Sequence, residues 1–230
     1  MKSTIVAAAC LALFATCASA EVYHVTVWNG EADGGAGSIF NADSADIPQP
    51  SATPLASFDF NTDAAGLNWA TSSNFNTYGD FLDGGSITGF TGAVDEATFL
   101  GQQMSVEGNR FASYFAISGL YTSSTGFSRT IMHDDGASLY VDGTNVFRSP
   151  GRVSGQATAG PYNFTAGTHQ FGLLYVAADG GPAVLNFALP NVINIASSDP
   201  DPVPEPSMVA LAGIGLLLLG LSRRRRLPAS

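Results

Sequence analysis

Cysteine and basic residues are both scarce in this sequence of 230 residues. Only two cysteines occur, Cys10 and Cys17, and only nine lysines and arginines oppose 19 aspartates and glutamates. Most of the basic residues lie at the two ends, so the stretch between Glu21 and Ser222 is strongly acidic. A surface of this charge repels phosphate backbones, which excludes nucleic acid as a partner and suits cations or neutral ligands.

Sustained helical periodicity is also absent, and charged residues make up only 12% of the chain against 45% hydrophobic residues. This composition excludes a disordered acidic chain and a coiled coil. The chain does contain 26 glycines and 12 prolines, which recur in short clusters between apolar runs. Such clusters are typical of a fold with many turns.

The first 20 residues are typical of a secretory signal peptide. Lys2 gives a basic start, residues 5–14 form an apolar run, and Ala18-Ser19-Ala20 is a small-residue cleavage pattern. Both cysteines lie inside this segment, so we expect the mature protein to contain no disulfide. An exported domain without disulfides depends on its hydrophobic core, with or without help from a metal.

The end of the chain combines a short motif, an apolar stretch and a basic cluster. Val203, Pro204, Glu205 and Pro206 precede an uncharged stretch over residues 208–221, and Arg223, Arg224, Arg225 and Arg226 follow it. A full membrane span needs about 20 residues, so this stretch is short. Taken alone, it predicts a thin transmembrane helix whose arginines stay in the cytoplasm.

Together these three parts resemble the PEP-CTERM sorting signal of Gram-negative bacteria that produce exopolysaccharide. The resemblance implies export and transient insertion of the 208–221 helix into the inner membrane. It also implies processing near Pro204 to Pro206 by an exosortase-type transpeptidase, with the cell surface or the extracellular matrix as destination. Because the chain is the substrate of that enzyme, the motif indicates no catalysis by the chain itself.

Between its two ends the chain is predicted to form one β domain. We expect a signal peptide at residues 1–20, the domain at 21–195, a proline- and aspartate-rich linker at 196–202, and the sorting signal at 203–230. Short runs rich in β-branched and aromatic residues recur between turn clusters. They predict strands at 22–28, 57–60, 114–117, 127–132, 139–141, 169–176 and 184–187.

Many short strands separated by turns predict an all-β fold, an antiparallel β-sandwich. Residues 29–54 are broken up by glycine and proline, which predicts a surface loop or a peripheral flap. Residues 61–92 are also rich in turn residues and are predicted to be largely loop, either as plain turns or as the mouth of a site.

One acidic motif carries the main functional prediction. Asp134-Asp135-Gly136 interrupts an alternating apolar pattern, and Asp142-Gly143 predicts a tight hairpin turn. Two adjacent carboxylates repel each other unless a positive charge lies near, and calcium takes oxygen ligands of this type. Spacing alone leaves two interpretations open: a cation site, or a turn in which one aspartate is a cap and the other is solvated.

Residues 126–190 resemble the protective-antigen-type domain, a jelly-roll type β-sandwich of bacterial toxins, glycosidases and fungal adhesins. The resemblance rests on the acidic motif, on the segment 166–175 and on Gly180-Gly181 before the last strand. It implies that Asp134 and Asp135, joined by a cis peptide, coordinate calcium that in turn holds sugar hydroxyls. It also implies Asp179, in the loop after residue 175, as a third calcium ligand.

His133 and Tyr140 are further candidates for ligand contact. The His133 imidazole has three open roles: a hydrogen bond to the carboxylates, ligation of a softer metal, or orientation of the loop. Tyr140 either stacks on a sugar ring or fills the core. His24 lies in the first predicted strand with no partner visible in the sequence, and the three histidines match no zinc motif.

The sequence therefore predicts a non-enzymatic, exported surface protein. Its sandwich is expected to be stabilised by calcium and to bind carbohydrate of an extracellular polysaccharide. Catalysis is not expected, because the chain lacks a Gly-x-Ser-x-Gly elbow and its mature part lacks cysteine. The alternative is a purely structural protein of the biofilm matrix or envelope, in which the acidic loop only stabilises the fold.

Overall fold

A computed structural model describes residues 20–31, 41–42, 53–63, 65–71, 77–105, 111–151, 153, 155–178 and 180–194. The chain divides into two units, residues 1–194 and 195–230, and the second lies wholly outside the described residues. The signal peptide up to residue 19, the linker, and the sorting signal with its predicted 208–221 helix therefore lie outside them as well. In the part that is described, no helix is long and apolar enough to cross a membrane.

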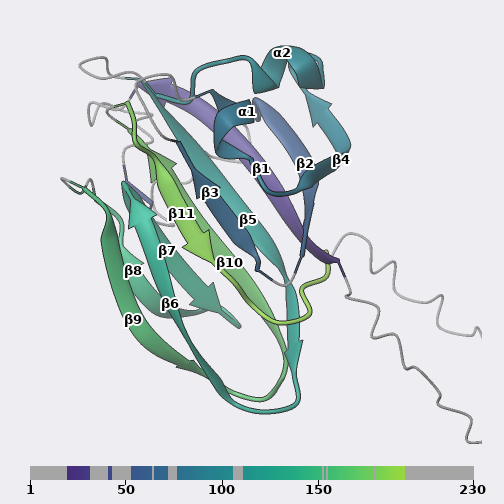
Figure 1. Ribbon diagram of the computed structural model, residues 1–230, viewed down its shortest axis with the longest axis vertical. Coiled ribbons are helices and arrows are strands. Elements are labelled where there is room, and N and C mark those ends of the chain that lie inside the picture. Colours follow the sequence, from purple (N-terminus) through teal and green to yellow (C-terminus); the bar gives the residue numbers. More distant parts are fainter. Residues whose placement is uncertain are drawn as a thin grey trace, which may run out of the picture. The chain divides into compact units, whose positions relative to one another are not determined.

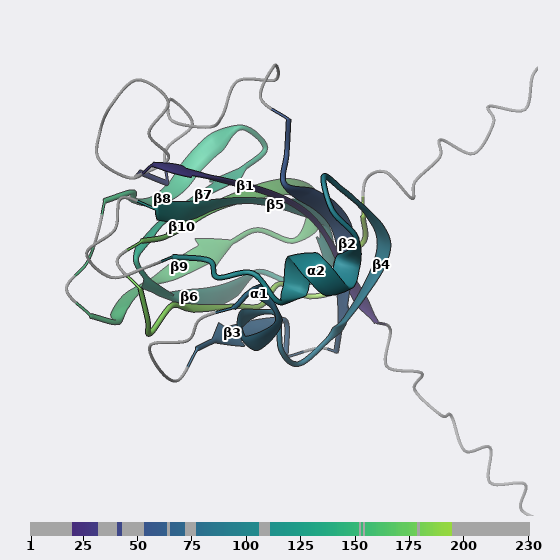
Figure 2. The ribbon, with the colours of Figure 1, turned by 90° about the horizontal axis from the view of Figure 1, so that it is seen from above.

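Two antiparallel sheets face each other (Figures 1 and 2). The larger sheet has seven strands in the order β4-β2-β1-β5-β10-β7-β8. These strands are β1 (Glu21–Glu31), β2 (Ala56–Thr62), β4 (Ser86–Gly92), β5 (Phe111–Ser123), β7 (Gly136–Val141), β8 (Thr144–Ser149) and β10 (Gly167–Ala177). The smaller sheet has four strands in the order β3-β11-β6-β9. These are β3 (Leu67–Ala70), β6 (Phe127–Asp134), β9 (Ala157–Phe164) and β11 (Val184–Phe187).

The all-β antiparallel sandwich predicted from the sequence is confirmed. Each predicted strand lies within an observed strand, and the predicted strand 184–187 coincides with β11. The sequence missed β3, β4 and β9, whereas the predicted hairpin turn at Asp142-Gly143 already implied a strand where β8 lies. It also missed two short helices, α1 (Tyr78–Phe81) and α2 (Glu96–Leu100).

Two predicted loops need correction. Residues 61–92 contain β3, α1 and β4 rather than mainly loop. Their order comes from tertiary packing, because Phe90 of β4 stacks on Phe58 and also contacts Phe99. Residues 29–31 belong to β1, and most of the remaining predicted flap lies outside the described residues.

An aromatic core lies between the sheets. Alternate residues of the central strands face it, because successive side chains of a strand point to opposite faces. In β1 the buried set is Tyr23, Val25 and Val27, and in β10 it begins at Phe171. The remaining large members include Phe58, Phe60, Trp69, Phe81, Phe115, Leu173 and Tyr175. Burial of this apolar surface holds the sheets together without any disulfide.

The predicted hairpin between β7 and β8 is confirmed. Asp142 and Gly143 connect the paired residues Val141 and Thr144, and their φ angles are 49° and 75°. Positive φ at both central residues is the requirement of a type I′ turn. The Asp142 carboxylate accepts hydrogen bonds from the Gln170 backbone N–H at 3.0 Å and from His169 Nδ1 at 2.7 Å. The hairpin is thereby fixed to β10.

The Asp142–His169 pair should make a pH-dependent contribution to stability. The hydrogen bond between them lowers the pKa of Asp142 and raises the pKa of His169. A lowered aspartate pKa stabilises the fold above the unfolded value of about 4, and a raised histidine pKa does so below about 6.5. The contribution is therefore largest between these two values. It declines as the pH falls through the pKa of Asp142 or rises through that of His169.

We expect Asp142→Asn to melt below the wild type by an amount that peaks in this window. Asparagine is a suitable control residue because it also tolerates positive φ in the turn. The measurement is the melting temperature of both proteins across pH 3 to 9. A difference that stays constant with pH would show that the ion pair contributes nothing.

Candidate functional site

The two sheets are joined directly at the acidic motif. β6 of the smaller sheet ends at Asp134, and β7 of the larger sheet begins at Gly136. Asp134 pairs with Val184 of β11, whereas the Asp135 N–H donates to the Val176 carbonyl of β10 at 3.3 Å. Each aspartate is thus held by a different sheet. The peptide bond between them is cis, as the protective-antigen resemblance implies.

Glycine is required at position 136 by a close approach of backbone. A Cβ atom added there would lie 2.0 Å from the Pro150 carbonyl oxygen. The chain after β8 therefore passes directly against the start of β7. This contact explains why glycine follows the two aspartates.

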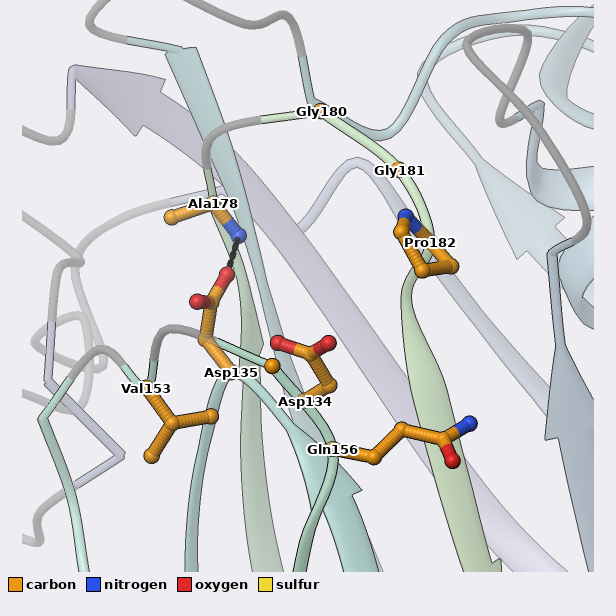
Figure 3. Close-up of a pocket in the computed structure, with 9 residues that line it drawn as sticks. Asp134, Asp135, Val153, Gln156, Ala178, Gly180, Gly181 and Pro182 are labelled. Atoms are coloured by element: carbon orange, nitrogen blue, oxygen red, sulfur yellow. Dashed lines mark hydrogen bonds between the residues drawn. The ribbon is translucent and has the colours of Figure 1, made fainter.

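The Asp134 and Asp135 carboxylates line a pocket of about 310 Å³ (Figure 3). Both point toward the segment that contains Ala178 and Gly180. The other lining residues come from the β8–β9 and β10–β11 connections: Val153, Gly155, Gln156, Ala178, Gly180, Gly181 and Pro182. None of these described lining residues is basic.

Both aspartates are buried, with exposed fractions of 8% for Asp134 and 5% for Asp135. Burial raises the pKa of Asp134, because an ionised carboxylate loses its hydration there. Among the described residues, no hydrogen bond to the Asp134 carboxylate offsets that loss. The Asp135 carboxylate differs, since its Oδ2 accepts the Ala178 N–H at 2.7 Å. The site therefore contains one carboxylate fixed by the backbone and one that is costly to ionise.

The main-chain carbonyls of the motif are held by two other side chains. The Tyr175 hydroxyl donates to the Asp134 carbonyl oxygen. His133 Nδ1 lies 2.6 Å from the Asp135 carbonyl oxygen and donates to it. Burial lowers the pKa of His133, which favours the neutral imidazole. These bonds fix the backbone of the motif and leave the carboxylates directed at the pocket.

The structure brings only part of the predicted site together. His133 is 1% exposed, packs against Phe147 and does not line the pocket, so its geometry is that of a residue that orients the loop. Tyr140 packs against an apolar cluster that includes Tyr114 and Val176, and it does not line the pocket either. Ligand contact by His133 or Tyr140 stays a prediction.

Asp179 lies outside the described residues, although both of its chain neighbours line the pocket. Within the described ranges, no group of three or more His, Cys, Asp and Glu side chains could hold a metal. The role of Asp179 as a third carboxylate ligand therefore also stays a prediction.

Three lining residues were missed by the sequence analysis. Val153, Gly155 and Gln156 lie between β8 and β9 and reach the pocket only because β9 pairs with β6. No local pattern marks them. Gln156 is the only described lining residue besides the aspartates whose side chain carries hydrogen-bonding groups.

Gly136→Ala should destabilise the fold through the Pro150 contact. Overpacking of this kind costs about 1–3 kcal/mol of the free energy of unfolding. Gly172→Ala is the matched control, because a Cβ there meets no atom within 4 Å. Denaturant unfolding of both variants checks this. Equal stability of Gly136→Ala and the wild type would contradict the close approach.

Asp134→Asn should stabilise the protein in a chelator at neutral pH. The raised pKa means that Asp134 costs stability as the pH rises above the unfolded value, and this cost is complete above the folded pKa; asparagine removes it. The advantage should shrink as the pH falls and the wild-type carboxylate takes up its proton. The measurement is the free energy of unfolding at several pH values. A less stable variant at neutral pH would show that the ionised carboxylate is already compensated.

The chain is similar to several solved structures and to one protein-family model. No curated protein matches it. Among solved structures it is similar to a PA14 sugar-binding domain from an RTX adhesin, at 18% identity, a TM-score of 0.49, and coverage of 73% of this chain and 88% of that chain. The PA14 domain of the antifreeze protein MpAFP gives 15% identity, a TM-score of 0.49, and coverage of 76% and 91%. A GH31 α-xylosidase from Xanthomonas citri gives 11% identity, a TM-score of 0.36, and coverage of 73% and 13%.

Residues 202–226 match the protein-family model described as the PEP-CTERM protein-sorting motif. The match coincides with the motif, apolar stretch and arginine cluster that carry the resemblance in the sequence. The predicted sorting signal is thereby confirmed. The chain carries a PEP-CTERM protein-sorting motif, which indicates export and sorting to the cell surface or the extracellular space.

Proposed function

We propose that this protein is a non-enzymatic surface protein whose sandwich binds calcium at Asp134 and Asp135, and binds carbohydrate through that calcium. The pocket beside these carboxylates is the proposed site. The carbohydrate is a neutral sugar of the extracellular polysaccharide. The C-terminal 208–221 segment holds the protein in the membrane until an exosortase-type transpeptidase of a Gram-negative bacterium processes it.

One observation carries the calcium proposal. Two adjacent carboxylates are buried at the same pocket, and no described lining residue is basic. Buried charge is costly unless it is paired or coordinates a metal. A hard divalent cation compensates both charges and takes the carboxylate oxygens that the pocket presents.

The pocket also suits the coordination number of calcium. Calcium takes six to eight oxygen ligands, and two aspartates supply only some of them. By resemblance, Asp179 is a further oxygen donor of the chain, whereas the Gln156 amide points away from the two carboxylates (Figure 3). Positions that remain are open to water or to sugar hydroxyls, which are neutral and therefore tolerated by an acidic surface.

The size of the pocket limits the ligand. A volume of about 310 Å³ lies at the lower end of the range for small-molecule sites, which is about 300–1,000 Å³. The pocket therefore accommodates one sugar ring rather than a length of polysaccharide. We expect the pocket to bind the end or a branch of a polysaccharide.

The test is thermal unfolding with calcium and with a chelator. Calcium at about 100 times its dissociation constant adds about 2.7 kcal/mol, or roughly 5–10 °C in melting temperature for a domain of this size. Asp134→Asn should lose this shift. Glu96→Gln, an isosteric change at an exposed carboxylate of α2, should keep it.

The carbohydrate step is then tested with a glycan array in calcium and in chelator. Binding that requires both calcium and Asp134 supports the proposal. A calcium shift without any glycan signal would favour the alternative, a structural matrix protein with a stabilising ion. An identical shift in Asp134→Asn would contradict the site itself.

A further inference from the structure

A chain of hydrogen-bonded polar side chains crosses β1 and β2 on the outer face of the seven-stranded sheet. Tyr23 of β1 and Phe58 of β2 are buried in the core. The residues next to them in each strand therefore point to the opposite, outer face of the sheet. The register places His24 opposite Asp59 and Thr26 opposite Ser57.

The distances give this cluster a defined order. His24 Nδ1 lies 2.9 Å from Asp59 Oδ1, and His24 Nε2 lies 3.3 Å from Ser57 Oγ. A carboxylate only accepts hydrogen bonds, so the imidazole proton is on Nδ1. Nε2 then presents its lone pair to the Ser57 hydroxyl and accepts its proton. This is the connectivity of a nucleophile, a general base and a carboxylate that orients the base.

The carboxylate in this cluster is itself held in place. The buried Asn194 donates from Nδ2 to Asp59 Oδ1 at 2.5 Å. At the other end, Thr26 Oγ1 lies 3.4 Å from Ser57 Oγ. The His24 and Asp59 side chains remain partly exposed, so the cluster is open to solvent. His24, Asp59 and Ser57 are thus ordered by mutual hydrogen bonds and remain accessible. A polar face that only contacts water needs no such order.

We propose that Ser57 is a base-activated nucleophile that accepts an acyl group from an activated ester. His24 is the general base and Asp59 is a positioning residue that fixes the imidazole tautomer. In this step Ser57 Oγ forms a bond to the acyl carbon and the bond from that carbon to the leaving oxygen breaks. The Ser57 proton passes to His24 Nε2 and from there to the leaving alkoxide or aryloxide.

The proposal concerns one acyl transfer to Ser57, which needs only the nucleophile and its base. It goes beyond the calcium site and shares no residue with it. A chelator should leave acylation unchanged, so failure of one proposal is distinguishable from failure of the other. A purely structural hydrogen-bond ladder would stabilise the strands without making Ser57 reactive.

The experiment treats the full chain with p-nitrophenyl acetate and, separately, with a fluorophosphonate probe. Released p-nitrophenolate gives the rate, and peptide mass spectrometry locates the label. We expect acetyl and phosphonyl groups on Ser57. General-base assistance contributes about 10²–10⁴-fold, so His24→Gln should slow acetylation at least about 100-fold. Asp59→Asn should also slow it, because the imidazole loses its fixed tautomer.

Ser118→Ala is the matched control. Ser118 lies opposite His24 on β5, but it is not one of the groups bonded to the imidazole, so its removal should leave the rate unchanged. Label on residues other than Ser57, absence of label, or an equal rate in a folded His24→Gln variant would overturn the proposal. Peptide mapping of the wild-type chain decides the first two outcomes even if a variant does not fold.

Discussion

The short passage between the two sheets at Asp134-Asp135-Gly136 is the constraint on which the site depends. One residue separates the end of β6 from the start of β7, so Asp135 lies where the chain changes sheets. Gly136 is packed against the Pro150 carbonyl, and His133 and Tyr175 bond the motif's own carbonyls. Because these contacts fix the backbone, both carboxylates are directed into the pocket, even though burial opposes the ionisation of Asp134.

The sequence predicted the interior of the fold better than its margins. All seven predicted strands exist, and the three missed strands, β3, β4 and β9, are all edges of the two sheets. In β4 and β9 almost no side chain is fully buried, so hydrophobic alternation is weak there, whereas β3 does alternate but has only four residues. β9 also contains Gly160 and Pro161, and β4 ends on a glycine. Local patterns in such segments indicate turns, but pairing with a neighbouring strand makes these segments strands.

The same distinction holds for the residues of the candidate site. Asp134 and Asp135 were predictable because they are adjacent in sequence and a turn motif surrounds them. Gln156 was not, because it reaches the pocket through the pairing of β9 with β6. His24 was assigned no partner from sequence, yet the antiparallel register of β1 and β2 brings Asp59 and Ser57 to its two ring nitrogens. Contacts made across strands leave no local signal.

An acidic, sorted sandwich with a carboxylate-lined pocket is chemically suited to a cation and a neutral ligand. The most direct test is a crystal structure of the protein grown in calcium, with anomalous diffraction to identify the ion. We expect a calcium ion bonded to carboxylate oxygens of both Asp134 and Asp135 at about 2.3–2.6 Å. A pocket without an ion at saturating calcium would contradict this expectation.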